Sequence, residues 1–347
     1  MALPGTGYFP NLIDAARAMD PQGKIDKVVE LLQQSNQILI DMPWQEGNLP
    51  TGHLTTVRTG LPAVIWRKMY QGVPAGKSQR AQVTDACGML TARSEVDKKL
   101  AELNGNRDAF RLSEAFAFIE AMNQAMASTL FYGDTDVNPE RFTGLSARFS
   151  VAPTNASPAA NSVNVIDAGG LIADNTSIWL ISWGPNTCHG IFPKGSKAGL
   201  IHEDLGEIDC LDVNGDRYRG YADTFEWDSG LCLRDWRYCV RIANIDTANL
   251  VAGVAGAAAL VLLMLKAIHR LPNIGVVGGP PDLMPMYGRP VFYCNRTVYE
   301  MLDIQSINTT QFTLKSGSDI FGNPVTFCRG IPIRCVDALL NTETRVT

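Results

Sequence analysis

Apolar positions follow a helical period most clearly between Arg107 and Gly133. They recur at steps of three and four residues, which places them on one face of an α-helix and leaves charged positions such as Arg111 in contact with water. At 1.5 Å per residue this helix is roughly 35–40 Å long, and Gly133 favours the left-handed conformation that ends many helices. The segment is either an ordinary core helix or the spine of a flat, extended subunit. The predicted buried stripe comprises Leu112, Phe116, Ile119, Met122, Met126 and Leu130.

The segment before this helix has the pattern of a β-hairpin with one sign of charge. The turn residues between Gly72 and Gly76 place its tip there. No Asp or Glu occurs from Gly47 to Thr84. Because a two-stranded hairpin is marginally stable alone in water, we expect it to lie on another surface. The predicted strands cover 53–58, 63–70 and 79–90, and the basic residues are Arg58, Arg67, Lys68, Lys77 and Arg80.

Residues 176–245 have the pattern of an antiparallel β-region, and part of it is acidic. The alternation from Trp236 to Ile242 predicts a half-buried strand. Asn214-Gly215 is a strong signal for a hairpin turn. Nine acidic residues occur from Glu203 to Asp228, against two arginines.

The two ends of the chain differ in character. The N-terminal residues suggest a modest amphipathic helix over 25–32, followed by an apolar anchor at Met42 and Trp44. Near the other end, the apolar run from Leu250 to Leu265 is shorter than the roughly 20 residues that a membrane span needs, so we expect a fully buried helix there. A strand, a helix that begins after Asn295 and a polar hairpin follow, as the order of patterns predicts.

Composition excludes several classes of protein. With 347 residues, 46% hydrophobic content and a net charge of −5, the chain is a globular protein without the basic face of an unspecific nucleic-acid binder. Eight cysteines without C-x-x-C pairs and only four histidines give a zinc site no support. We therefore expect reduced, mostly buried thiols, no metal and no cofactor.

Candidate catalytic motifs are each explained better by local structure. The run Gly72–Ser78 has three residues between its glycines where a phosphate-binding loop needs four. The segment from Gly275 lacks the dinucleotide spacing and continues into Pro280-Pro281. Asp212–Asp216 is better read as a turn than as a calcium loop. Cys188 and His189 are adjacent in the chain, which does not set up a nucleophile and its base. No convincing active site is visible, so we expect that the protein is not an enzyme.

The closing segment carries a resemblance to a known family. A strand, then Asn295-Arg296-Thr297 opening a helix, a hairpin, and the sequences at 322–325 and 330–333 (GNPV and GIPI) resemble the corresponding part of major capsid proteins of tailed double-stranded-DNA bacteriophages. The likeness is greatest to podovirus-type coat proteins without a fused scaffold. It implies an α+β protein with the Hong Kong 97 phage fold, in which hexamers and pentamers close into an icosahedral shell.

The resemblance also implies named parts and partners. The partners are identical subunits, a separate scaffolding protein, a portal protein, an optional decoration protein and packaged double-stranded DNA, without any membrane, in a virion assembled in the host cytoplasm. Lys77 is the only lysine placed for a covalent cross-link, and a solvated surface explains it better. The expected parts are an N-arm (1–46), an E-loop or extended hairpin (47–95), a P-domain with the spine helix (96–149), a loop and part of the A-domain (150–200), the P-domain β-region (201–245), the remaining A-domain (246–325) and a C-terminal strand region (326–347).

Charge complementarity predicts how the subunits meet. We expect the hairpin of one subunit to lie across the acidic β-region and the spine of its neighbour, with burial of apolar side chains supplying most of the stabilisation. The alternatives are a soluble oligomeric enzyme with a cleft near 275–290 and, third, a DNA-binding module. The expected contact residues are Arg58, Trp66, Arg67, Lys68, Lys77 and Arg80 on the hairpin and Glu203, Asp204, Glu207, Asp223, Glu226 and Asp228 on the neighbour.

Overall fold

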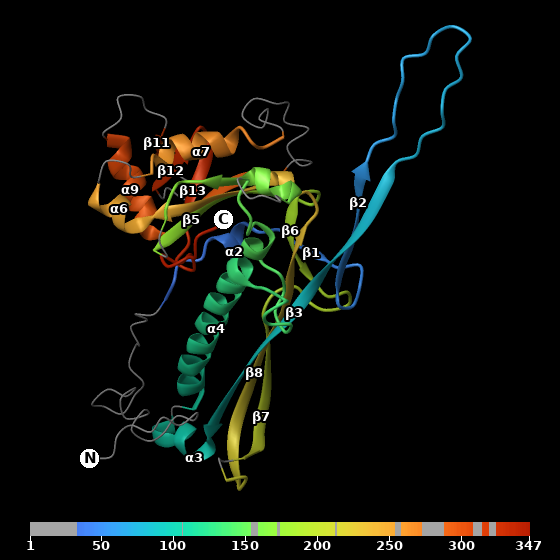
Figure 1. The fold of residues 1–347 in the computed structure, drawn as a ribbon. Helices are drawn as coiled ribbons and strands as arrows, with labels where there is room; N and C mark the ends of the chain where they lie inside the picture. The colour runs from blue at the N-terminus through green and yellow to red at the C-terminus, as the bar shows by residue number, and fades with distance from the viewer. Residues whose placement is uncertain are drawn as a thin grey trace.

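The structure, a computed structural model, shows an elongated subunit with a compact α/β region at one end, a long ribbon of strands beside one helix, and a hairpin that projects away from both (Figure 1). The mixture of helices and strands agrees with the α+β class expected from the sequence. The described residues are 33–105, 107–153, 159–171, 174–211, 214–253, 258–272, 288–307, 314–318 and 324–347.

Thirteen strands of the described chain form one hydrogen-bonded sheet, in which β11-β12-β13-β10-β5-β6-β8-β3-β2 are successive neighbours. In addition β1 pairs with β6, β7 with β8, and β9 with both β4 and β5. The strands are β1 (Trp44–Glu46), β2 (Gly52–Gly60), β3 (Gln79–Asp97), β4 (Val165–Asp167), β5 (Asn175–Trp183), β6 (Cys188–Phe192), β7 (Ile201–Leu211), β8 (Arg217–Leu233), β9 (Cys239–Asp246), β10 (Arg289–Cys294), β11 (Leu314–Ser318), β12 (Pro324–Cys328) and β13 (Ile331–Cys335).

The predicted spine helix is confirmed as α4 (Arg107–Tyr132). It begins after the short helix α3 (Lys98–Ala101), which Asp97 caps by accepting the Lys99 N–H at 2.7 Å. It ends at Gly133, where any Cβ would collide with the carbonyl oxygen of Phe142. Gly133 does not take a positive φ, so the left-handed conformation expected there was wrong and close packing accounts for the glycine instead. Only the second half of the predicted stripe is buried, because the first half of α4 packs on the sheet through Phe110 and Phe118 instead. Leu112, Phe116 and Ile119 are 58%, 55% and 39% exposed, so the expectation of their burial was wrong.

The compact α/β region contains two apolar cores on opposite faces of its strands. One core lies beside the end of α4 and includes Leu130, Phe131 and Trp179. The other lies under three helices and includes Phe292 and Met264. These helices are α6 (Thr247–Ala252), α7 (Leu260–Ile268) and α9 (Arg296–Ile307), with α9 capped by Asn295, whose Oδ1 accepts the Val298 N–H at 2.8 Å.

Two predictions for this region need correction. The apolar run that suggested one buried helix contains the two helices α6 and α7, because Gly253 takes a left-handed conformation (φ 61°) and ends α6. Val251 and Leu262 are more than half exposed, so neither helix is fully buried. The strand expected from Trp236 begins only at Cys239, and it is buried on both faces rather than one, because β9 lies inside the sheet between β4 and β5.

The N-terminal part of the described chain attaches to the same sheet. The short helix α2 (Ile38–Asp41) precedes β1, which runs parallel to β6. Met42 is 3% exposed and the Trp44 ring lies 6.2 Å from that of Trp227, which confirms the apolar anchor predicted there. The helix predicted over 25–32 lies outside the described residues.

Candidate assembly surfaces

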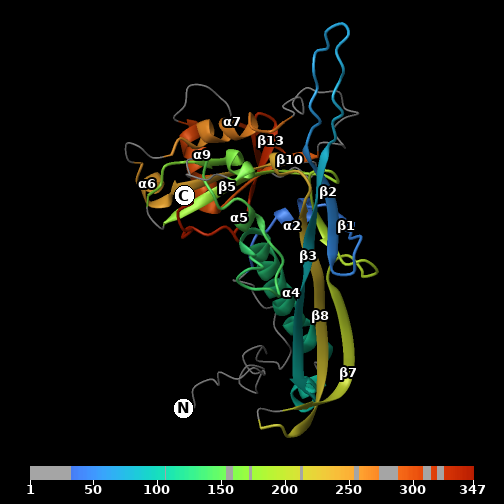
Figure 2. The same ribbon diagram turned by 45° about the vertical axis from the view of Figure 1, so that its right-hand side comes forward.

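The basic hairpin, residues 52–97, is formed by β2 and the 19-residue strand β3. Its base joins the sheet, since β3 leaves β2 at Ala86 and pairs with β8 from Cys87 onward. Its far end extends away from the other described elements of the subunit (Figures 1 and 2). Every residue from Leu61 to Lys77 is exposed. This segment therefore makes no core of its own.

The strand predicted over 63–70 is wrong, although the hairpin itself is confirmed. These residues have no ladder partner in the described chain, and unpaired backbone in water gains nothing from strand geometry. The chain reverses at Lys68–Gln71 rather than at the expected glycines, with the Gln71 N–H donating to the Lys68 carbonyl at 3.2 Å. Tyr70 takes a positive φ of 65° in this turn.

The predicted contact residues of the hairpin all face water. Trp66 is fully exposed, and Val64 and Met69 are each 90% exposed. Arg58 and Arg80 are directly opposite each other on β2 and β3, a like-charge pair that destabilises an isolated sheet. All five basic residues predicted as contacts (Arg58, Arg67, Lys68, Lys77 and Arg80) are exposed.

Strand alternation divides the six predicted acidic contacts between the two faces of the β7–β8–β3 ribbon. Asp204 and Asp223 are paired in register and face α4, where Arg111 contacts them at 2.5 Å and 2.8 Å. Glu207 lies on the same face and pairs with Lys98 at 2.9 Å. These three carboxylates are therefore already neutralised within the subunit.

The other three acidic residues lie on the face of the ribbon that α4 does not cover. Glu226 is opposite Thr91 and Asp228 is opposite Met89, and regular alternation turns both away from Asp223. Glu203 is opposite Thr224 and so shares this face. Glu203, Glu226 and Asp228 form no ion pair within the described residues. We call this surface, together with the 79% exposed Met89, the open acidic face.

The position of Arg111 off the apolar stripe predicted that it contacts water, and this prediction was wrong. Its side chain is 14% exposed, and its guanidinium lies 5.4 Å from the centre of the Tyr221 ring. The hydrogen bond from Arg111 lowers the pKa of Asp204, and the hydrogen bond from Lys98 lowers that of Glu207. No local pattern marks such a residue, because its partners are 93 and 112 positions away.

The exposed apolar residues of α4 lie on the opposite side of the ribbon from the open acidic face. Figure 2 shows α4 along one side of β3, β8 and β7. The ribbon lies between Leu112 and Phe116 on one side and the free carboxylates on the other. The two parts of the predicted contact, the acidic region and the spine, therefore lie on different sides of the ribbon within one subunit.

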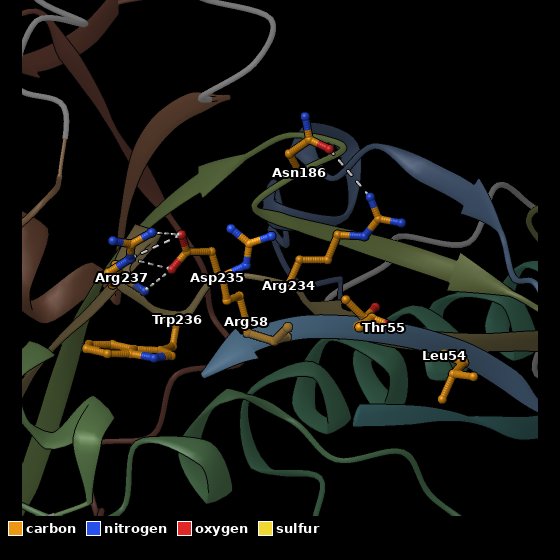
Figure 3. A pocket seen from close by; sticks show the side chains of 10 residues that line it. Leu54, Thr55, Arg58, Asn186, Arg234, Asp235, Trp236 and Arg237 are labelled. Atoms are coloured by element: carbon orange, nitrogen blue, oxygen red, sulfur yellow. Dashed lines mark hydrogen bonds and ion pairs between the residues drawn. The ribbon is translucent and has the colours of Figure 1, made fainter. Parts of the chain in front are cut away.

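A pocket of about 740 Å³ lies where the hairpin joins the sheet. Its lining includes Arg58, Arg234 and Arg237, with Asp235 paired to Arg237 at 2.6 Å (Figure 3). Three guanidinium groups against one carboxylate leave this pocket positive, without a nucleophile and base arranged for chemistry. In the region 275–290, where the enzyme alternative places its cleft, residues 275–287 lie outside the described residues. Gly288, Arg289 and Pro290 are described, and they line a smaller pocket of about 330 Å³ together with Asp41 and Trp183.

No helix in the described part of the chain is long and apolar enough to cross a membrane.

No curated protein sequence matches the chain. Residues 20–347 match the family model described as Major capsid protein GP7. Among solved structures, a chain from bacteriophage Epsilon15 is 34% identical with a TM-score of 0.76, and the match covers 100% of this chain and 99% of that one. The capsid of bacteriophage JBD30 matches at 9% identity and a TM-score of 0.46, over 89% and 93% of the two chains. The chain thus belongs to the Major capsid protein GP7 family, and it is a phage major capsid protein of the Hong Kong 97-like fold whose copies form the shell of the virion.

Proposed function

We propose that shell assembly depends on the basic hairpin of one subunit lying on the open acidic face of its neighbour. The observation that carries this proposal is the complete exposure of Leu61–Lys77, which includes large apolar side chains and basic residues without acidic partners. A stretch of neighbouring large apolar side chains exposed on a subunit marks an interaction site. The open acidic face offers the opposite charge, and its Met89 offers apolar surface.

Electrostatics and burial have different parts in this contact. Rim charges set the register and the rate of encounter more than the affinity. Full burial of a large apolar side chain such as Val64 or Met69 contributes about 1.5–3 kcal/mol. An acidic partner near Arg58 and Arg80 also offsets their mutual repulsion. Because closure of a shell makes each weak contact part of a multivalent assembly, modest single interfaces suffice.

The resemblance to podovirus-type coat proteins supports the remaining parts of the proposal. The subunits form hexamers and pentamers around packaged double-stranded DNA, in the host cytoplasm, with a separate scaffolding protein, a portal protein and an optional decoration protein. We propose that the chain has no catalytic activity and that the subunit consists of an N-arm, an E-loop, a P-domain and an A-domain. The pairing of Asp204, Glu207 and Asp223 within the subunit leaves Glu203, Glu226 and Asp228 as the neighbour's contact residues.

Charge reversal tests the docking contact. Arg67→Glu, Lys68→Glu and Arg80→Glu together should leave the subunit folded but abolish shells in cells that co-express the scaffolding protein, as scored by sedimentation and negative-stain electron microscopy. The matched control reverses three exposed basic residues of the α/β region, Lys266, Arg289 and Arg345, with the same change in net charge.

A compensating variant makes the test specific to the proposed partners. Glu203→Lys, Glu226→Lys and Asp228→Lys should also prevent closure, and the chain that carries both sets of reversals should recover shells because complementarity returns. Normal shells from the hairpin triple variant would refute the docking contact. Failure of the combined chain, with its fold intact by circular dichroism, would refute the open acidic face as the partner.

A further inference from the structure

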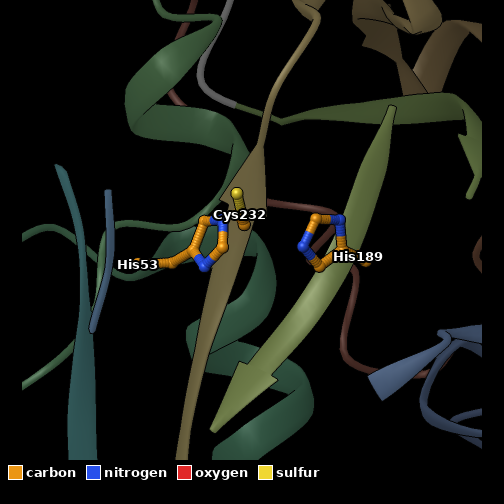
Figure 4. A group of neighbouring side chains, drawn as sticks. All are labelled: His53, His189 and Cys232. Carbon is orange, nitrogen blue, oxygen red and sulfur yellow. The ribbon is translucent and has the colours of Figure 1, made fainter. Parts of the chain in front are cut away.

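A row of metal-binding side chains lies across four neighbouring strands at the base of the hairpin. We propose that His53, His189 and Cys232 bind one divalent transition-metal ion of the zinc class. Their ligand atoms, on β2, β6 and β8, all lie within 4.8 Å of one another. Figure 4 shows the two imidazole rings close together with the thiol beside them; the ring planes are nearly perpendicular, at 82°.

Sheet register explains why these distant residues meet. His189 is paired with Cys232, and His53 is paired with Asp85. The ladder between β3 and β8 ends with the pair Cys87–Gly230, and Asp85, two residues further along β3, interacts with Cys232 on β8. Residues opposite one another in adjacent strands point to the same face, so the four side chains form one row across β6, β8, β3 and β2. This convergence has no signature in the sequence, which is why spacing indicated no metal there.

The row is buried, and three of its four ring nitrogens have no hydrogen-bond partner among the described residues. His189 and Cys232 are fully buried, and His53 is 7% exposed. Both ring nitrogens of His189 and Nδ1 of His53 form no hydrogen bond with any described residue. Buried polar atoms without partners are uncommon in native proteins and call for an explanation such as a bound ion.

The surrounding charges are mixed. Asp85, which is 4% exposed, supplies negative charge beside His53. Its carboxylate also forms an ion pair with the Arg148 guanidinium, with an N–O distance of 2.8 Å. Arg234 opposes a cation, because its guanidinium donates to His53 Nε2 at 3.0 Å. Arg234 also donates to the carbonyl of Pro185 at 3.0 Å, so it keeps a partner when it releases His53. A metal ion therefore competes with Arg234 for His53.

The donor set selects the kind of metal. Two imidazoles and one cysteine thiol, which releases its proton to solvent when the metal binds, suit Zn²⁺ or Co²⁺ in a tetrahedral site, with the fourth position open to water. Tetrahedral zinc sets its ligand atoms about 3.5 Å apart, so the row must close by roughly 1 Å on binding. The bound ion would join β2, at the base of the hairpin, to β6 and β8, and so fix the direction in which the hairpin leaves the sheet. The site does not rest on the proposed docking contact.

Metal content of the isolated subunit tests this inference directly. Protein expressed with added zinc and purified without chelators should carry about one zinc per chain by inductively coupled plasma mass spectrometry, as expected for a single site. Co²⁺ added after zinc removal should give the visible bands of a tetrahedral, thiolate-bound ion. Cys232→Ser should abolish both signals. Cys294→Ser, which removes a buried thiol from the other core, is the matched control and should retain them.

Arg234→Gln provides a second variant with an effect of the opposite sign. It removes the competing cation, so it should bind zinc more tightly than the unmodified chain, by tenfold or more in a chelator competition. Unmodified subunit with far less than one zinc per chain and no cobalt bands would overturn the proposal, whether or not Cys232→Ser folds. Equal zinc content in Cys232→Ser and the unmodified chain would overturn it as well.

Discussion

The ion pair between Arg241 and Glu343 gives the sharpest test of what stabilises the subunit. Both side chains are almost fully buried, at 5% and 4% exposure, and their N–O distance is 2.9 Å. Arg241 also donates to the Phe149 carbonyl at 2.9 Å and to Ser177 Oγ at 3.1 Å. Glu343 accepts from Tyr132 Oη at 2.5 Å. The network thereby ties the C-terminal tail to α4, β5 and β9.

Glu343→Gln keeps the size of the side chain but leaves the Arg241 charge buried without its counter-ion. Removing one partner of a buried pair costs about 3–5 kcal/mol, because the remaining charge stays desolvated. Arg241→Met combined with Glu343→Leu removes both charges and should cost less than either single substitution. An exposed pair provides the control: Arg219 and Asp209 are 66% and 50% exposed, so Asp209→Asn should cost at most about 1 kcal/mol.

Equilibrium unfolding of the unassembled subunit in guanidinium chloride measures these differences. Trp179 is a suitable fluorescence probe, since its ring centre lies 5.2 Å from the Arg241 guanidinium. Limited proteolysis of the C-terminal tail should show increased cleavage in Glu343→Gln and not in Asp209→Asn. If the free energy of unfolding of Glu343→Gln is within about 1 kcal/mol of that of the unmodified chain, the ion pair does not hold the C-terminal tail in place and the prediction is refuted.

Two further predictions concern the spine and the last helix. Arg111 lowers the pKa of Asp204 in the folded state, so this contact stabilises the fold above the unfolded pKa of about 3.9 and the stabilisation is lost as the pH falls through the lowered folded value. Arg111→Gln should therefore be less stable at pH 7 and should lose less on acidification from pH 5 to pH 3, measured by thermal unfolding; an unchanged pH dependence would count against the contact. Asn295→Ala should cost about 1–2 kcal/mol by removing the cap on the Val298 N–H, whereas Asn295→Ser, which keeps a capping oxygen, should lose less; both variants equally lose the bonds that Asn295 Nδ2 donates to Thr176 and Asn341. Equal losses in the two Asn295 variants, compared by denaturant unfolding, would show that the cap is not the cause.

Local patterns predicted the elements whose structure depends on their own residues. Spacing located α4, the Asn214-Gly215 turn between β7 and β8, and the start of α9 after Asn295. In each case a cap, a glycine or a sustained period lies within the element. Boundaries were predicted well where such a residue marks the end, as at Gly133.

The errors share a physical cause, which is dependence on distant partners. Arg241 alternates with apolar neighbours as an exposed residue would, yet its counter-ion Glu343 makes burial possible. Phe116 fits a buried stripe, yet the sheet contacts the adjacent face of the helix. The row containing His53 and His189 exists only because register aligns four strands. Local patterns in a single sequence do not reveal which distant residues pair in this way.

The continuity of β3 has a mechanical consequence. One uninterrupted strand runs from Gln79, on the return arm of the hairpin, to Asp97, which caps α3. At about 3.3 Å per residue it reaches roughly 60 Å, and its pairing with β8 has no register shift. If the hairpin contacts a neighbouring subunit as proposed, a tilt imposed on the hairpin would be transmitted along this one strand to α3, which leads into the spine helix.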